Sequence, residues 1–245
     1  MKIISIMNRK GGASKTTTAQ ALGQGLELKE FKVLYIDLDS QCNLTYVLNK
    51  PISDKSIYDV LVNGENINNY IANNLICGST LLSTSDMKIT GNGKEYRLKN
   101  SLGSIKNQYD YIIIDTPPAL NILTVNAIAA STTIIIASNA DILAIQGILQ
   151  LKDTISIVKK QCNNDLTIDG ILLTKFNLRT VLNRDLLKAF DNIANQLNTK
   201  IYKTRIRESV AIREAQIKKM NLYEYAPKNG AIKDYGEFVG EFLNG

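Results

Sequence analysis

Five short runs of apolar, mostly β-branched residues recur along the chain, and segments with helical patterns separate them. The runs cover residues 3–7, 33–36, 111–114, 133–137 and 168–173. They show little alternation of apolar and polar residues, which is typical of strands buried on both faces of a parallel sheet. Such strands, joined by helical crossovers, predict an α/β fold with a doubly wound, mostly parallel sheet and helices on both faces.

Helical patterns lie between these runs at residues 17–28, 120–130 and 182–197. In the first of them Ala19, Leu22 and Leu26 share one stripe at helical spacing. Residues 116–140 carry no charge, but their Pro-Pro pair and polar residues favour a buried helix followed by a core strand over a membrane span. Because no repeat and no Pro-, Gly- or Ser-rich linker divides the chain, we expect one domain spanning residues 1–245.

Histidine is absent from the 245 residues, which excludes Ser-His and Cys-His nucleophilic pairs, histidine general bases and histidine-ligated metals. The three cysteines, Cys42, Cys77 and Cys162, form no CxxC pair and are too few for a structural zinc site or a disulfide framework. No stretch approaches the ~18 to 20 apolar residues of a membrane helix, and the first residues lead into a glycine-containing loop without signal-peptide architecture. We therefore expect a cytoplasmic protein with reduced cysteines.

A glycine-containing loop joins the first apolar run to the first helical pattern. Residues 8–17 read Asn-Arg-Lys-Gly-Gly-Ala-Ser-Lys-Thr-Thr. A loop at this place points unpaired backbone N–H groups and the positive end of a helix at a phosphate group. Gly11 and Gly12 allow close approach of the backbone to phosphate oxygens. Lys15 offers a charge to the β and γ phosphates, and the Thr16 hydroxyl can bind Mg²⁺.

The loop departs from the common phosphate-loop pattern GxxxxGK[ST], because Arg9 and Ser14 occupy both glycine positions. It fits the variant KGGxxK[ST], and with this motif the chain resembles the ParA/MinD family of deviant Walker A ATPases. In that family the additional lysine, here Lys10, reaches the phosphates bound to a partner subunit. The resemblance implies an ATP site formed by Lys10, Gly11, Gly12, Ala13, Ser14, Lys15, Thr16 and Thr17.

Ser14 is a departure with an energetic consequence. If the loop needs a left-handed backbone at this position, a serine there costs on the order of 1 kcal/mol or more. We expect this cost to weaken or slow nucleotide handling without abolishing it.

Carboxylates follow the second apolar run. Alternation along a strand puts Asp37 and Asp39 on the same side, at the carboxyl end of the sheet, where doubly wound folds bind ligands. The segment resembles the family's DxDPQGN motif, with Ser40 and Cys42 at its Pro and Gly positions. By that resemblance Asp39 positions the attacking water, and Asp37 helps to hold Mg²⁺ and its water shell.

Asp115 ends the third apolar run and precedes Thr-Pro-Pro. The segment resembles the family's Walker B strand and the switch after it, which implies that Asp115 binds Mg²⁺ through water and that Thr116 senses the γ phosphate. A lone carboxylate here is more often a cap or turn residue. Three motifs in this order, each at a strand end, indicate an ATPase, and the resemblance implies that its catalytic residues are Lys10, Lys15 and Asp39.

Positive charge is concentrated in the C-terminal third. Residues 175–219 contain 11 Lys or Arg and 4 Asp or Glu, which gives this segment +7 and leaves the rest of the +6 chain at −1. Scattered charges usually form a solvated helix face, but this imbalance favours contact with DNA phosphates without sequence preference. The candidates are Lys175, Arg179, Arg184, Lys203, Arg205, Arg207, Arg213, Lys218 and Lys219.

The resemblance covers nearly the whole chain and is strongest to short ParA/Soj-type DNA partition ATPases. It implies an ATP-dependent homodimer that binds nonspecific DNA on the nucleoid, partitions plasmid or chromosomal DNA, and is reset by a ParB-like centromere-binding partner. Hydrolysis should be slow, since no strong general base is present.

Two alternatives remain open. One is a MinD-like membrane-associated positioning ATPase, which is disfavoured because residues 234–245 carry three acids and no Lys or Arg, so that anionic lipid would repel them. The other is a nucleotide-binding adaptor in which Ser14, Ser40 and Cys42 have weakened catalysis.

Overall fold

The structure is a computed structural model that describes residues 1–49, 55–176 and 182–245, with the backbone alone for residues 182–185. Within these residues seven strands form one sheet in the order β3-β2-β4-β1-β5-β6-β7, and all neighbouring strands are parallel. The strands are β1 (Lys2–Met7), β2 (Val33–Asp37), β3 (Leu75–Ile76), β4 (Tyr111–Asp115), β5 (Thr133–Asn139), β6 (Thr167–Thr174) and β7 (Lys200–Ile201).

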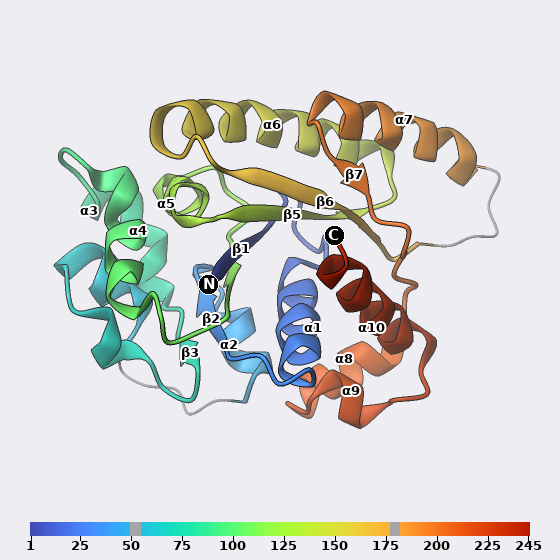
Figure 1. The fold of residues 1–245 in the computed structure, drawn as a ribbon, viewed down its shortest axis with the longest axis horizontal. Helices are drawn as coiled ribbons and strands as arrows, with labels where there is room; N and C mark the ends of the chain where they lie inside the picture. The colour runs from blue at the N-terminus through green and yellow to red at the C-terminus, as the bar shows by residue number, and fades with distance from the viewer. Residues whose placement is uncertain (50–54, 177–181) are drawn as a thin grey trace.

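Helices connect and cover these strands (Figure 1). They are α1 (Lys15–Glu27), α2 (Asn43–Val47), α3 (Ser85–Lys88), α4 (Arg97–Leu102), α5 (Ile122–Ala130), α6 (Ile142–Cys162), α7 (Leu182–Gln196), α8 (Val210–Ile217), α9 (Leu222–Tyr225) and α10 (Gly230–Leu243). Shorter 3₁₀ or π turns lie between β2 and β4: η1 (Asp59–Asn63), η2 (Ile67–Tyr70), η3 (Thr80–Thr84), η4 (Lys94–Tyr96) and η5 (Gly103–Ile105). In the described part of the chain no helix combines the length and the apolar character needed to cross a bilayer.

The predicted doubly wound fold is confirmed. Each of the five predicted runs forms a strand, and no strand end differs from its predicted position by more than two residues. The predicted helices at 17–28, 120–130 and 182–197 correspond to α1, α5 and α7. The sequence did not indicate β3 and β7, because two residues are too few for a recognisable hydrophobic period.

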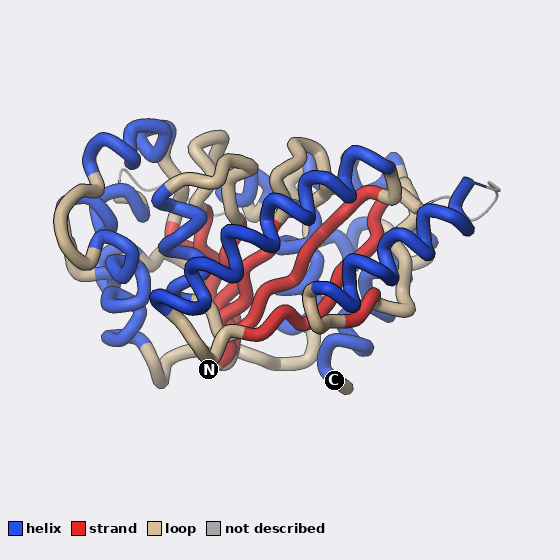
Figure 2. Tube along the Cα trace, turned by 90° about the horizontal axis from the view of Figure 1, so that it is seen from above, coloured by secondary structure: helices blue, strands red, loops and turns tan. Residues whose placement is uncertain are grey.

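Alternating side chains of each strand pack on opposite faces of the sheet. In β1, Ile4 and Ile6 belong to the core beneath α1 and α10, whereas Ile3 and Met7 belong to the cores on the other face. Figure 1 shows α1 and α10 on one side of the sheet and α6 and α7 on the other, and Figure 2 shows α6 and α7 lying over the strands and running nearly along them. Both faces are therefore covered, which explains the near-continuous apolar runs.

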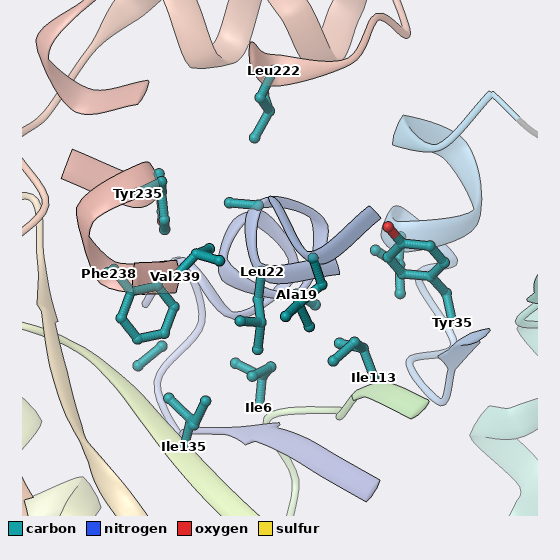
Figure 3. Close-up of a cluster of buried hydrophobic side chains, with 14 of the residues drawn as sticks. Ile6, Ala19, Leu22, Tyr35, Ile113, Ile135, Leu222, Tyr235, Phe238 and Val239 are labelled. Atoms are coloured by element: carbon teal, nitrogen blue, oxygen red, sulfur yellow. The ribbon is translucent and has the colours of Figure 1, made fainter. Parts of the chain in front are cut away.

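Helix α1 is surrounded by apolar side chains from the sheet and from the C-terminal helices. In Figure 3, Leu22 of α1 lies next to Ile6 of β1, and Tyr235, Phe238 and Val239 of α10 lie along one side of the helix. These side chains are buried. Because α1 follows the glycine-containing loop directly, this packing holds the loop in place relative to the sheet.

Three strands end side by side at the carboxyl edge of the sheet. Asp37 of β2 stands opposite Asp115 of β4, and Asp115 stands opposite Ile6 of β1. The glycine-containing loop begins directly after β1. The parallel register thus brings the loop and both carboxylates to one place.

Gly23 of α1 allows the helix to approach β2 closely. A Cβ added at Gly23 would lie 2.5 Å from Cζ of Tyr35, whose side chain is fully buried. We expect Gly23→Ala to lower the free energy of unfolding by about 1 to 3 kcal/mol, because the buried ring must shift. The gain in helix propensity, about 1 kcal/mol, offsets only part of this cost.

Denaturant unfolding followed by circular dichroism measures this effect. Gly103→Ala is the matched control, since Gly103 has a φ of −57° and a Cβ there would meet nothing within 4 Å. Equal stability of Gly23→Ala and the unmodified protein would contradict the close packing of α1 on Tyr35.

Candidate functional site

The loop between β1 and α1 is tied to the neighbouring strand by Asn8. The buried Asn8 side chain donates to the Ala137 carbonyl at 2.6 Å and accepts from the Lys10 N–H at 2.8 Å. Gly12 has a φ of +73°, and a Cβ added at Gly11 or Gly12 would meet nothing within 4 Å. The loop therefore presents its backbone to open space, as a phosphate site requires.

Ser14 stands immediately before α1 with a left-handed backbone, at φ 62° and ψ 25°. This confirms the conformation for which a cost was predicted, about 1 kcal/mol for a residue other than glycine. The Ser14 side chain makes no capping hydrogen bond. The N–H groups of the first helical turn thus lack a side-chain acceptor at Ser14, which favours an anion there.

Thr16 and Asp115 are directly bonded. The Thr16 hydroxyl donates to Oδ2 of Asp115 at 2.6 Å, whereas Oδ1 of the fully buried Asp115 has no hydrogen-bond partner in the described residues. Burial raises the pKa of Asp115 to about 8, and the neighbouring Asp37 adds to the increase. A buried carboxylate with a free oxygen can be satisfied by a cation or by its bound water.

Asp37 lies beside Asp115, and both of its oxygens are engaged. Its Oδ2 accepts from the N–H and the hydroxyl of Thr45, both at 2.8 Å, and its Oδ1 accepts from the Asp39 N–H at 3.1 Å. Burial nevertheless raises the pKa of Asp37 to about 6. Asp37 therefore fixes the start of the segment that carries Asp39 and places a carboxyl group next to Asp115.

Lys15 and Asp39 complete the charged set. Lys15 is 7% exposed, and burial lowers its pKa against the opposing effects of Asp115 and Asp39. Asp39 is 9% exposed, and its Oδ1 accepts from the Gln41 N–H at 3.0 Å. Cys42, at the glycine position of the family motif, has a φ of 53° and immediately precedes α2. One buried ammonium thus lies near two carboxyl groups, and Asp37 lies beside one of them, Asp115.

A cavity of about 380 Å³ opens in front of the loop. This volume lies within the ~300 to 1,000 Å³ usual for ligand pockets. The first wall is formed by the loop and the start of α1, and the second by the C-terminal third of the chain. The lining includes residues 11–17, Asp39, Gln41, Pro118, Lys175, residues 206–209, Ile212, Arg213, Gln216 and Tyr235.

The residues of the segment predicted to sense a γ phosphate have different surroundings in the structure. Thr116 is buried, and its hydroxyl donates to the Ile6 carbonyl at 2.7 Å. Pro118 lines the cavity. The proline therefore lies at the cavity, whereas the Thr116 hydroxyl links the end of β4 to β1.

Lys10 is outside the set of residues that line the cavity. Its Nζ lies 2.7 Å from Oδ2 of Asp141, and the two side chains are 37% and 35% exposed. The other oxygen of Asp141 accepts from the Ala144 N–H at 2.8 Å and so caps α6. Burial alone would raise the pKa of Asp141, but hydrogen bonds from Lys10 and Ala144 outweigh it and hold the pKa below its ordinary value.

Three of the nine basic candidates for DNA contact line the cavity, namely Lys175, Arg207 and Arg213. Arg207 also donates two hydrogen bonds of 2.8 Å to Asp234. These three cations are therefore close to the proposed phosphate loop, and Arg207 already has a carboxylate partner.

The other basic candidates lie elsewhere. The cationic groups of Arg205, Lys218 and Lys219 stand over aromatic rings at 4.9, 4.9 and 4.4 Å from the ring centroids, and Lys203 is exposed. Arg179 lies outside the described residues, and Arg184 lies in α7 where side chains are not described.

Sequence reasoning missed three polar residues that support the site: Asn8, Asp141 and Gln216. Gln216 of α8 donates to the Thr17 hydroxyl at 3.1 Å and to Oε1 of Gln20 at 3.0 Å. No sequence motif includes these residues as site residues, because each forms a hydrogen bond or ion pair with a segment that is distant in the sequence and close only in the fold. The polar type of Asn8 between an apolar strand and the glycines was the one available signal.

The residues present fit a magnesium ion bound together with a nucleotide. In the described parts of the chain, no three His, Cys, Asp or Glu side chains are grouped so as to hold a metal by themselves. Mg²⁺ commonly takes one or two protein oxygens and completes its shell with phosphates and water. The Thr16 hydroxyl and the unpartnered oxygen of Asp115 supply this smaller set.

Residues 1–168 match the family model described as an AAA domain. The chain is similar to the sporulation initiation inhibitor protein Soj of Bacillus subtilis, with 34% identity over 98% of this chain and 97% of that protein. It is also similar to the chromosome-partitioning ATPase Soj of Treponema pallidum, with 30% identity over 99% of this chain and 97% of that protein. A structure of cobyrinic acid a,c-diamide synthase from Mycobacterium smegmatis, with a bound ATP analogue and magnesium, matches with a TM-score of 0.83 and 27% identity, covering 100% of this chain and 95% of that chain.

The raised pKa of Asp115 predicts that the metal-free protein becomes less stable as the pH rises. Its pKa in the folded protein, about 8, lies above the ordinary value of 3.8. Between these values the folded protein retains a proton that the unfolded chain releases, so rising pH favours unfolding. We expect this group alone to lower the free energy of unfolding by roughly 2 to 4 kcal/mol between about pH 5 and 8.

Urea unfolding in the presence of a chelator, at several pH values, measures this effect. Asp115→Asn should lose less stability over the range than the unmodified protein, because the ionisation is removed. Asp153→Asn, which changes an exposed residue of α6, is the control and should follow the unmodified protein. An Asp115→Asn slope equal to that of the unmodified protein would rule out the buried ionisation as its cause.

Proposed function

This chain belongs to the ParA/Soj-type partition ATPases, and from that premise we propose that it is an ATP-dependent homodimer that binds DNA without sequence preference. In this proposal the protein binds ATP with Mg²⁺, hydrolyses ATP slowly, and is reset by a ParB-like centromere-binding protein. It would act on the nucleoid in the cytoplasm and partition plasmid or chromosomal DNA. Residues 1–245 would work as one P-loop ATPase domain.

The observation that carries the proposal is the joint placement of Lys15, Thr16 and Asp115 at the glycine-containing loop. Lys15 is buried beside the cavity, Thr16 is bonded to Asp115, and Asp115 has an oxygen without a partner in the described residues. The backbone of residues 11–17 lines the cavity. These groups together would bind the phosphates of a nucleotide through N–H groups, a lysine and a divalent cation.

Magnesium would be held by Thr16 and, through water, by Asp115 and Asp37, and it would neutralise charge on the phosphate oxygens. Lys15 would donate to the β and γ phosphates. Asp39, at the cavity wall, would orient the attacking water. None of these residues is a strong general base, which supports slow turnover.

Lys10 would provide the dimer contact by reaching the phosphates bound to the second copy. In the single chain its Nζ is paired with Asp141 at 2.7 Å. A pair of this exposure contributes only about 0 to 1 kcal/mol, so a bound triphosphate on a partner can compete for the lysine. Two copies joined in this way would place two basic surfaces on one DNA duplex.

The DNA surface would be formed by the basic candidates outside the cavity. Among the described side chains these are Lys203, Arg205, Lys218 and Lys219. Contacts to phosphates would make the binding independent of sequence and sensitive to salt. Pull-downs with DNA and with anionic liposomes in the presence of ATP separate this proposal from a membrane-associated function, for which binding to liposomes alone is the expected outcome.

Lys15→Ala tests ATP binding and dimerisation together. We expect a loss of ATP affinity of roughly 10- to 100-fold, because the charge-assisted hydrogen bonds to the phosphates are lost. ATP-driven dimerisation, measured by light scattering after size-exclusion chromatography, should disappear. Lys29→Ala, which changes an exposed lysine just after α1, is the control and should dimerise normally. A Lys15→Ala protein that still forms the ATP-dependent dimer would refute the mechanism.

Asp39→Ala tests the hydrolytic step. We expect the rate of phosphate release to fall roughly 100-fold, because the attacking water is no longer oriented. The ATP-bound dimer should persist on DNA, as measured by a salt-dependent DNA-binding assay. Asp153→Ala is the control for loss of a carboxylate at an exposed position. Phosphate release at the normal rate from Asp39→Ala would remove Asp39 from the mechanism, and absence of DNA-stimulated ATPase activity in the unmodified protein would favour a non-enzymatic adaptor.

A further inference from the structure

Lys175 is the first residue after β6, and its backbone turns sharply there. Its φ is +51°, in the left-handed region that residues other than glycine seldom adopt. The next residue is fixed, since the Phe176 N–H donates to the Ile206 carbonyl at 2.9 Å. A lysine in this conformation costs about 1 kcal/mol relative to glycine, and such strain is often found at ligand sites.

The turn directs the Lys175 side chain to the glycine-containing loop. Its Nζ donates to the Gly12 carbonyl at 3.0 Å. Nδ2 of Asn139 donates to the same carbonyl at 3.5 Å, and Oδ1 of Asn139 accepts from the Thr174 hydroxyl at 3.0 Å. The ends of β5 and β6 are thus joined to the loop at a single peptide group, and Lys175 lines the cavity.

No carboxylate among the described side chains is paired with the charge of Lys175. Within the described residues Lys175 forms no ion pair, and its hydrogen bond goes to a neutral carbonyl. Two other basic residues near the site are paired, Lys10 with Asp141 and Arg207 with Asp234. An exposed ammonium at the rim of an anion site, held there by a neutral group, is available to an anion.

Carboxyl groups outnumber the buried ammonium at the site. Lys15 lies near Asp39 and Asp115, and Asp37 lies beside Asp115. A polyphosphate brings more negative charge to the same place. A second lysine at the rim reduces this repulsion, and because an ammonium has three N–H donors it can bind a phosphate oxygen while keeping the Gly12 carbonyl.

We propose that Lys175 is a nucleotide-binding residue, whose ammonium group contacts a phosphate of the bound nucleoside di- or triphosphate, and that it is not part of the DNA surface. The proposal rests on the proposed function, because it requires a nucleotide in the cavity. It adds to the phosphate loop a residue that is 160 positions away from Lys15 in the sequence.

Isothermal titration of ATP, ADP and adenosine in the presence of Mg²⁺ tests the proposal. Lys175→Met keeps the length of the side chain and removes the charge, and Lys175→Arg keeps the charge. Lys29→Met is the control, in which an exposed lysine outside the cavity lining is changed in the same way. We expect Lys175→Met to raise the Kd of ATP and ADP by about 5- to 10-fold at low ionic strength. The effect should shrink as salt is raised from about 0.05 to 0.3 M.

The other measurements separate a phosphate contact from a structural role. Lys175→Arg should restore most of the ATP affinity, and Lys29→Met should bind ATP as the unmodified protein does. Adenosine, which has no phosphate, should bind Lys175→Met and the unmodified protein equally. Unchanged ATP affinity in Lys175→Met, or an equal loss for adenosine, would overturn the proposal while leaving the proposed function intact. An unmodified protein that binds neither ATP nor ADP would overturn the proposed function and the role of Lys175 with it.

Discussion

Crowding of carboxyl groups around one buried ammonium governs the structure of the site. The parallel register of β2 and β4 places Asp37 opposite Asp115, and Asp39 follows two residues later. Water cannot reach Asp115 to stabilise its charge, which is why the pKa of Asp115 is raised to about 8. A cation bound beside Asp115 would favour release of its proton, so the proposed Mg²⁺ would link metal binding, stability and pH through this residue.

The sequence was sufficient for the fold because burial on both faces leaves a strong pattern. Ile112, Ile113 and Ile114, for example, are all fully buried although they face opposite sides of the sheet. The same is true of the loop motif, whose residues are adjacent in the chain. Strands of two residues, such as β3 and β7, carry no such pattern and could not be predicted.

The opposite wall of the cavity could not be predicted, because it is formed by residues that only the fold brings near the loop. Counting charges grouped Lys175, Arg207 and Arg213 with the other basic residues of the C-terminal third. A net charge does not show on which surface of the fold each side chain lies. The structure turns these three residues to the cavity. The left-handed backbone of Lys175 is a tertiary feature of this kind, because a lysine gives no local signal for it.

The two carboxylate oxygens of Asp141 have different partners. One oxygen accepts the hydrogen bond that starts α6, and the other holds Lys10. Departure of the lysine therefore does not unwind the helix, whose first turn keeps its acceptor. In the proposed dimer Lys10 would leave Asp141 for the phosphates bound to the second copy, and the capping bond would hold the start of α6 in place, so the backbone there would not have to rearrange.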